Sequence, residues 1–92
     1  VGHHLRARER TQFDRALRQG YLEITEHDRA NLWHLWEKAC LAQGWDFLVL
    51  IKNTAANAGT IYVGDEPTTT DSLADAKNAV RQRAAKNLTV KG

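Results

Sequence analysis

The chain of 92 residues contains a single cysteine, Cys40. One thiol cannot close an internal bridge, which excludes the disulfide frameworks that stabilise many small secreted domains. Cysteine packs as a small apolar side chain, so we expect Cys40 to be buried and inert in a reducing, cytoplasmic compartment. The alternative is a reactive thiol, which would need an environment that stabilises the thiolate.

Long apolar stretches are also missing. The longest run, Phe47 to Ile51, has the length of a strand, far below the roughly 20 residues that a membrane-spanning helix needs. No apolar segment of a secretion signal is present near the N-terminus, so we expect no membrane partner and a cytoplasmic location. Because the chain opens at Val1 instead of methionine, we interpret residues 1–5 as a disordered or tag-derived N-terminus.

The composition is that of a folded domain. Hydrophobic residues make up 42% of the chain and charged residues 26%, and three tryptophans supply large apolar side chains. This length holds one core, so residues 6–92 are expected to form a single domain. A core of that size is thin, which keeps oligomerisation open.

Hydrophobic periodicity predicts an α+β domain, in which a small antiparallel sheet of three or four strands is packed by two or three helices. The pattern predicts helices over residues 6–19, 25–43 and from 71 or 72 onward. The first turns of the first helix carry arginines with little to bury, so we expect them to fray. The central helix has the clearest apolar stripe.

Strands are predicted over residues 21–25, 45–52 and 60–63, and a loop over residues 64–70. The central strand is apolar on both faces, which predicts that both faces are covered. Residues 88–90 leave two architectures open. A short strand there would give the ferredoxin-like order β-α-β-β-α-β behind an extra N-terminal helix. Without it, a three-stranded sheet would carry helices on one face.

Charge is distributed unevenly along the chain, whose net charge is +2. Residues 1–20 carry five basic and two acidic side chains, and so do residues 67–92, whereas residues 21–66 carry three basic and seven acidic ones. Positive ends therefore flank a negative middle. The basic side chains are expected either to form solvated faces, to pair with the acidic middle, or to contact phosphates.

The leading hypothesis is a small non-enzymatic domain that contacts nucleic-acid backbone through its basic terminal helices. Helical spacing places Arg8, Arg15 and Arg18 of the first helix within about 80° of one another, and the basic residues of the last helix on both flanks of its apolar stripe. The predicted nucleic-acid-binding residues are Arg8, Arg15, Arg18, Lys77, Arg81, Arg83 and Lys86.

Two other functions stay open. A protein-protein interaction module or homodimeric regulatory module would use Leu48 and Leu50, which need a cover on the second face of the central strand. A small metal-dependent hydrolase or nuclease would use Glu23 or Asp46, with Lys52 nearby, or the histidines. His27 and His34 lie about 10.5 Å apart along a helix, too far for one metal ion. We therefore expect no catalytic residue, no metal site and no cofactor.

Residues Ser72 to Ala79 resemble the start of the final helix of double-stranded-RNA-binding domains, and the preceding helix and two strands follow that family's order. The family has basic residues where this chain has Leu73 and Ala74, so the resemblance implies a phosphate contact at Lys77 alone. The family's third strand has no predicted counterpart between Val63 and Ser72.

Overall fold

The computed structural model describes residues 5–90, in which helices and strands alternate before the chain folds into consecutive hairpins. Gly20 and Gly44 end the first two α-helices in the left-handed conformation, as their positions in the sequence predict. Ser72 caps the last helix by accepting a hydrogen bond from the backbone N–H of Asp75. The elements are α1 (Ala7–Gln19), β1 (Leu22–Thr25), the 3₁₀ turn η1 (Glu26–Asp28), α2 (Arg29–Gln43), β2 (Leu48–Asn53), β3 (Ala58–Val63), β4 (Glu66–Thr70) and α3 (Leu73–Thr89).

The four strands form one sheet in the order β1-β2-β3-β4. β1 runs parallel to β2 and is joined to it through α2, whereas β2, β3 and β4 are antiparallel neighbours. The α+β class is confirmed, but the sheet is mixed. The ferredoxin-like order is not found, because residues 88 and 89 complete α3 instead of adding a strand.

Residues 66–70 form a strand, so the predicted loop is wrong there. Pro67 lies opposite Tyr62 and Thr68 lies opposite Ile61. A strand at the edge of a sheet tolerates proline, since one side of its backbone needs no partner. Most of β4 is exposed, so it lacks the apolar alternation by which strands are predicted.

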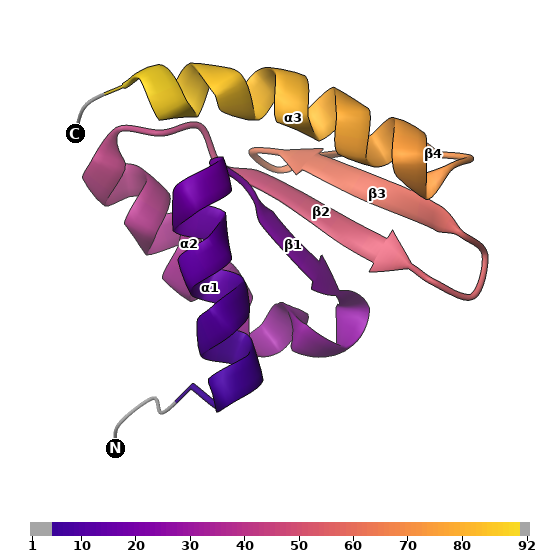
Figure 1. The fold of residues 1–92 in the computed structure, drawn as a ribbon, viewed down its shortest axis with the longest axis horizontal. Coiled ribbons are helices and arrows are strands. Elements are labelled where there is room, and N and C mark those ends of the chain that lie inside the picture. The colour runs from indigo at the N-terminus through magenta and orange to yellow at the C-terminus, as the bar shows by residue number, and fades with distance from the viewer. Residues whose placement is uncertain (1–4, 91–92) are drawn as a thin grey trace.

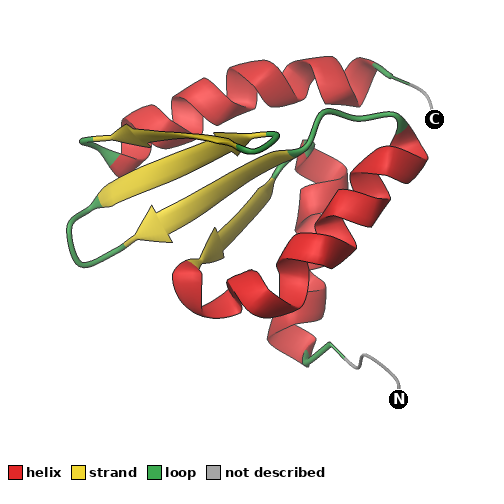
Figure 2. Cartoon of the chain, turned by 180° about the vertical axis from the view of Figure 1, so that it is seen from behind, coloured by secondary structure: helices red, strands yellow, loops and turns green. Residues whose placement is uncertain are grey.

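Helices cover both faces of the sheet, α1 and α2 on one and α3 on the other (Figure 1). Figure 2 shows the same arrangement from behind. Val49 and Ile51 of β2 pack beneath α1 and α2, whereas Leu48 and Leu50 pack beneath α3. The prediction that both faces of this strand are covered is confirmed. At Gly59, a Cβ atom would lie 2.8 Å from the Cβ of Ala76, so glycine permits the close approach of α3.

Leu5, the last residue of the segment interpreted as disordered or tag-derived, packs against the core on the α1 and α2 face. The rest of that predicted segment, residues 1–4, lies outside the described residues. Across residues 5–90, none of the helices has both the length and the apolar character needed to cross a membrane.

Candidate functional site

Ion pairs between the ends of the chain and its acidic middle account for part of the charge asymmetry. Arg8 of α1 pairs with Asp28, Nη2 to Oδ1, at 2.9 Å. On α3, the Nζ of Lys77 lies 3.6 Å from Oε2 of Glu23, and that of Lys86 lies 3.8 Å from Oδ2 of Asp46. Three of the seven predicted nucleic-acid-binding residues therefore have carboxylate partners within the chain.

Asp28 holds α1 against the end of β1. Its side chain is 1% exposed and accepts hydrogen bonds from Arg8, from Gln12 Nε2 and from the hydroxyl of Thr25, the last residue of β1. A buried carboxylate with three donors is well compensated for its loss of water. These contacts anchor the first turns of α1 to the end of β1, at the place where the sequence predicts fraying.

The stripe of α1 that faces β1 follows from helical spacing. Arg8, Gln12, Arg15 and Gln19 are separated by four, three and four residues, so they lie on one side of the helix. Arg8 and Gln12 bind Asp28 after the end of β1, and Gln19 donates to the carbonyl of Tyr21 before its start. Arg15 lies between these contacts on the same stripe and is exposed.

On the other side of β1, three side chains converge on the carboxylate of Glu23. Lys52 Nζ and Lys77 Nζ each lie 3.6 Å from Oε2 of Glu23, and the phenol of Tyr21 donates to Oε1 at 3.3 Å. Burial raises the pKa of Tyr21, and the Arg81 guanidinium beside the phenol acts in the opposite direction. β2 and α3 thus bring three basic side chains, Lys52, Lys77 and Arg81, next to Tyr21 and Glu23.

The two sides together form what we call the β1 surface, around a strand that has no neighbour on one edge of the sheet within residues 5–90. It contains five basic and two acidic side chains. Its residues are Arg8, Arg15, Tyr21, Glu23, Asp28, Lys52, Lys77 and Arg81.

The remaining predicted basic residues lie elsewhere. Arg83 and Lys86 are on the opposite flank of α3 from Lys77 and Arg81, and Lys86 pairs with Asp46 just before β2. Arg18 is exposed on the last turn of α1, on the side of the helix opposite the buried Ala16. The structure therefore divides the predicted set and adds Tyr21, Glu23 and Lys52 to the part near β1.

Leu48 and Leu50 were predicted to contact a partner, but both are 0% exposed and packed beneath α3. The cover that they need is supplied by the chain itself. The observation that motivated a homodimeric module is therefore explained within one copy.

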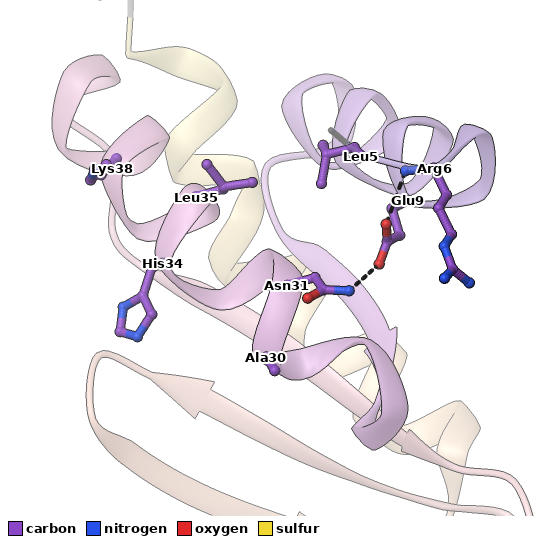
Figure 3. A pocket seen from close by; sticks show the side chains of 8 residues that line it. All are labelled: Leu5, Arg6, Glu9, Ala30, Asn31, His34, Leu35 and Lys38. Carbon is purple, nitrogen blue, oxygen red and sulfur yellow. Dashed lines mark hydrogen bonds between the residues drawn. The ribbon is translucent and has the colours of Figure 1, made fainter. Parts of the chain in front are cut away.

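A groove of about 510 Å³ lies between the N-terminal turn of α1 and α2 (Figure 3). Leu5 and Leu35 face each other across it, while Arg6 and His34 point away. Its carboxylate, Glu9, belongs to a residue only 4% exposed and accepts from Asn31 Nδ2 at 2.6 Å and from the backbone N–H of Arg6 at 3.0 Å. These hydrogen bonds lower the pKa of Glu9. One carboxylate oxygen joins α1 to α2 and the other caps the N-terminus of α1, which accounts for the buried charge without a ligand.

The carboxylates proposed for hydrolysis do not form one site. Glu23 is paired with Lys52 and Lys77, whereas Asp46 is paired with Lys86 before the start of β2. His34 lies 3.5 Å from Glu37, a single acidic neighbour. Within residues 5–90, no three His, Cys, Asp or Glu side chains gather in a way that could hold a metal ion.

Comparison with protein-family models, curated proteins and solved structures finds no match to this chain. β4 supplies a third strand between Val63 and Ser72, which the resemblance to double-stranded-RNA-binding domains had lacked. No match to a family model supports that resemblance. Any function assigned to the chain therefore rests on the geometry of the β1 surface.

Proposed function

We propose that the protein is a small non-enzymatic domain that binds the phosphate backbone of nucleic acid through the β1 surface. The observation that carries this proposal is that basic stripes from two helices far apart in the sequence, α1 and α3, border the same edge strand. Arg8 and Arg15 stand on one side, and Lys77 and Arg81 on the other. A phosphate backbone attracts such a surface whatever its base sequence.

The charge balance of the surface supports an anionic ligand. Its five basic side chains face two carboxylates, so the internal ion pairs leave it positive. Among the described residues, neither Arg15 nor Arg81 has a carboxylate within 4.0 Å. Both are exposed, so a backbone could be bound without first breaking an ion pair at either position. We therefore expect these two arginines to make the largest contribution.

The test is fluorescence anisotropy with labelled single-stranded DNA, duplex DNA and duplex RNA at two salt concentrations. Each phosphate neutralised on B-DNA contributes about −0.9 to the slope of log K against log salt, so about three contacts would weaken binding roughly 40-fold for a fourfold rise in salt. The double variant Arg15→Glu/Arg81→Glu is expected to abolish binding at moderate salt.

A matched control separates this surface from net charge. Arg10→Glu/Arg83→Glu makes the same two substitutions on the same two helices, away from the β1 surface, and is expected to retain most of the affinity. Circular dichroism establishes that both variants are folded. An equal loss of affinity in the two variants would show that binding depends on overall charge and not on the β1 surface. Unchanged affinity in Arg15→Glu/Arg81→Glu would refute the proposal.

A further inference from the structure

The cluster around Glu23 has a feature that an ordinary surface ion pair lacks, because two lysines from different elements share one carboxylate oxygen. Lys52 Nζ and Lys77 Nζ are each 3.6 Å from Oε2 of Glu23, so the two ammonium groups lie within about 7 Å of each other. All three side chains are partly withdrawn from solvent, with exposed fractions of 26%, 34% and 15%. Without an anion between them, the two ammonium groups would repel each other.

The donors around this point match those that bind a phosphate group. Two ammonium groups supply positive charge and N–H donors, and the phenol of Tyr21, a residue only 1% exposed, donates to the same carboxylate from the core side, with Arg81 beside that phenol. Carboxylate and phosphate offer the same kind of acceptor, an anionic oxygen. A phosphate in the place of the Glu23 carboxylate would meet these same donors.

We infer that Lys52, Lys77, Tyr21 and Arg81 form a discrete site for one backbone phosphate, and that Glu23 acts there as an internal anion which the phosphate displaces. This inference rests on the proposed function and goes beyond it. It identifies where on the β1 surface a single phosphate is held, and it makes Glu23 a residue that limits affinity. Lys52, on the sheet and outside both terminal helices, becomes a ligand-contacting residue.

Removing the internal anion should strengthen binding. In Glu23→Gln the two lysines lose their carboxylate but keep a hydrogen-bonding neighbour of the same size. A carboxylate about 5 Å from a bound phosphate repels it, and this repulsion lowers the affinity for the phosphate roughly three- to tenfold, depending on screening by salt. Up to two further cations become available, so the slope of log K against log salt should steepen by about one to two.

The experiment compares wild type, Glu23→Gln and Lys52→Gln by anisotropy with the same labelled duplex DNA over a series of salt concentrations. Glu37→Gln is the control, because it removes the same charge from the exposed face of α2. We expect three- to tenfold tighter binding and a steeper slope for Glu23→Gln, weaker binding and a shallower slope for Lys52→Gln, and wild-type behaviour for Glu37→Gln. Thermal denaturation verifies the fold of each variant, and Lys52→Gln tests the site by itself if Glu23→Gln does not fold.

The outcomes separate this inference from the proposed function. If Arg15→Glu/Arg81→Glu abolishes binding while Glu23→Gln and Lys52→Gln resemble wild type, the backbone binds the β1 surface and the discrete site is refuted. Weaker binding by a folded Glu23→Gln would show that Glu23 positions the lysines, which contradicts displacement. If neither wild type nor Glu23→Gln binds any probe at low salt, both proposals are wrong.

Discussion

Asn87, on the last turns of α3, makes the contacts from which the sharpest stability prediction can be worked out. Its side chain is 1% exposed. Nδ2 donates to the carbonyl of Gly20 at 2.9 Å and to that of Asp46 at 3.0 Å, and Oδ1 accepts from the backbone N–H of Asp46 at 2.9 Å. One amide therefore joins the end of α1, the segment before β2 and α3. The change that tests this is Asn87→Ala.

The magnitude follows from the groups that lose a partner. The carbonyl of Gly20, a buried residue, would cost about 1–3 kcal/mol if left without a donor. The backbone N–H and carbonyl of Asp46 belong to a partly exposed residue, where water can replace the amide. The loss of each of these two hydrogen bonds should therefore lower the free energy of unfolding by about 0.5 kcal/mol. The sum is roughly 3 kcal/mol, which for a domain of this size corresponds to a fall in Tm of roughly 12–24 °C.

Urea denaturation followed by tryptophan fluorescence measures this loss as a shift of the midpoint. Asn78→Ala is the matched control, because Asn78 is exposed on the same helix and the substitution brings the same gain in helix propensity. We expect the control to stay within about 0.5 kcal/mol of wild type. A difference below about 1 kcal/mol between the two variants would refute the role assigned to Asn87.

Two further predictions concern buried titratable groups. Burial raises the pKa of the Cys40 thiol to about 12, so a thiol reagent at about pH 8 should modify it only after unfolding in urea; rapid modification of the native protein would contradict this. The hydrogen bonds from Asn31 and Arg6 lower the pKa of Glu9 below its usual 4.5, so their contribution to stability is present above about pH 4.5 and is lost as the pH falls through the lowered pKa. Glu9→Gln should therefore flatten the acid side of a plot of Tm against pH, and an unchanged plot would count against the helix-joining role of Glu9.

The elements that could be predicted from the sequence are those whose apolar residues repeat with a clear period. The stripe of α2, with Leu32, Trp36 and Cys40 buried, and the doubly apolar β2 are of this kind. β4 was missed because its threonines are exposed and Pro67 interrupts the pattern, while its pairing depends on β3 beside it. The sequence left residues 88–90 open between a strand and none, because the side-chain hydrogen bonds of Asn87 at the end of α3 join residues that are far away in the sequence.

The candidate site was only partly predictable for a related reason. Helical spacing places Lys77 and Arg81 on one flank of α3, and Arg8 and Arg15 on one stripe of α1. Their position around β1 depends on which face of the sheet each helix covers, and a strand that is apolar on both faces does not determine that. The meeting of Glu23 with Lys52 depends on the parallel register that puts Glu23 opposite Leu50 and Thr25 opposite Lys52. The two strands are joined through α2, which packs on one face of the sheet, so this register is not determined by either strand alone.

The most direct test of the central claim is an NMR titration of the ¹⁵N-labelled protein with unlabelled duplex DNA at low salt. We expect amide shift changes to concentrate on Arg15, on residues 22–25, on Lys52, and on Lys77 and Arg81, and we expect added salt to reverse them. Changes concentrated on the exposed face of α2 or on β4, or no changes at all, would contradict the assignment of nucleic-acid binding to the β1 surface.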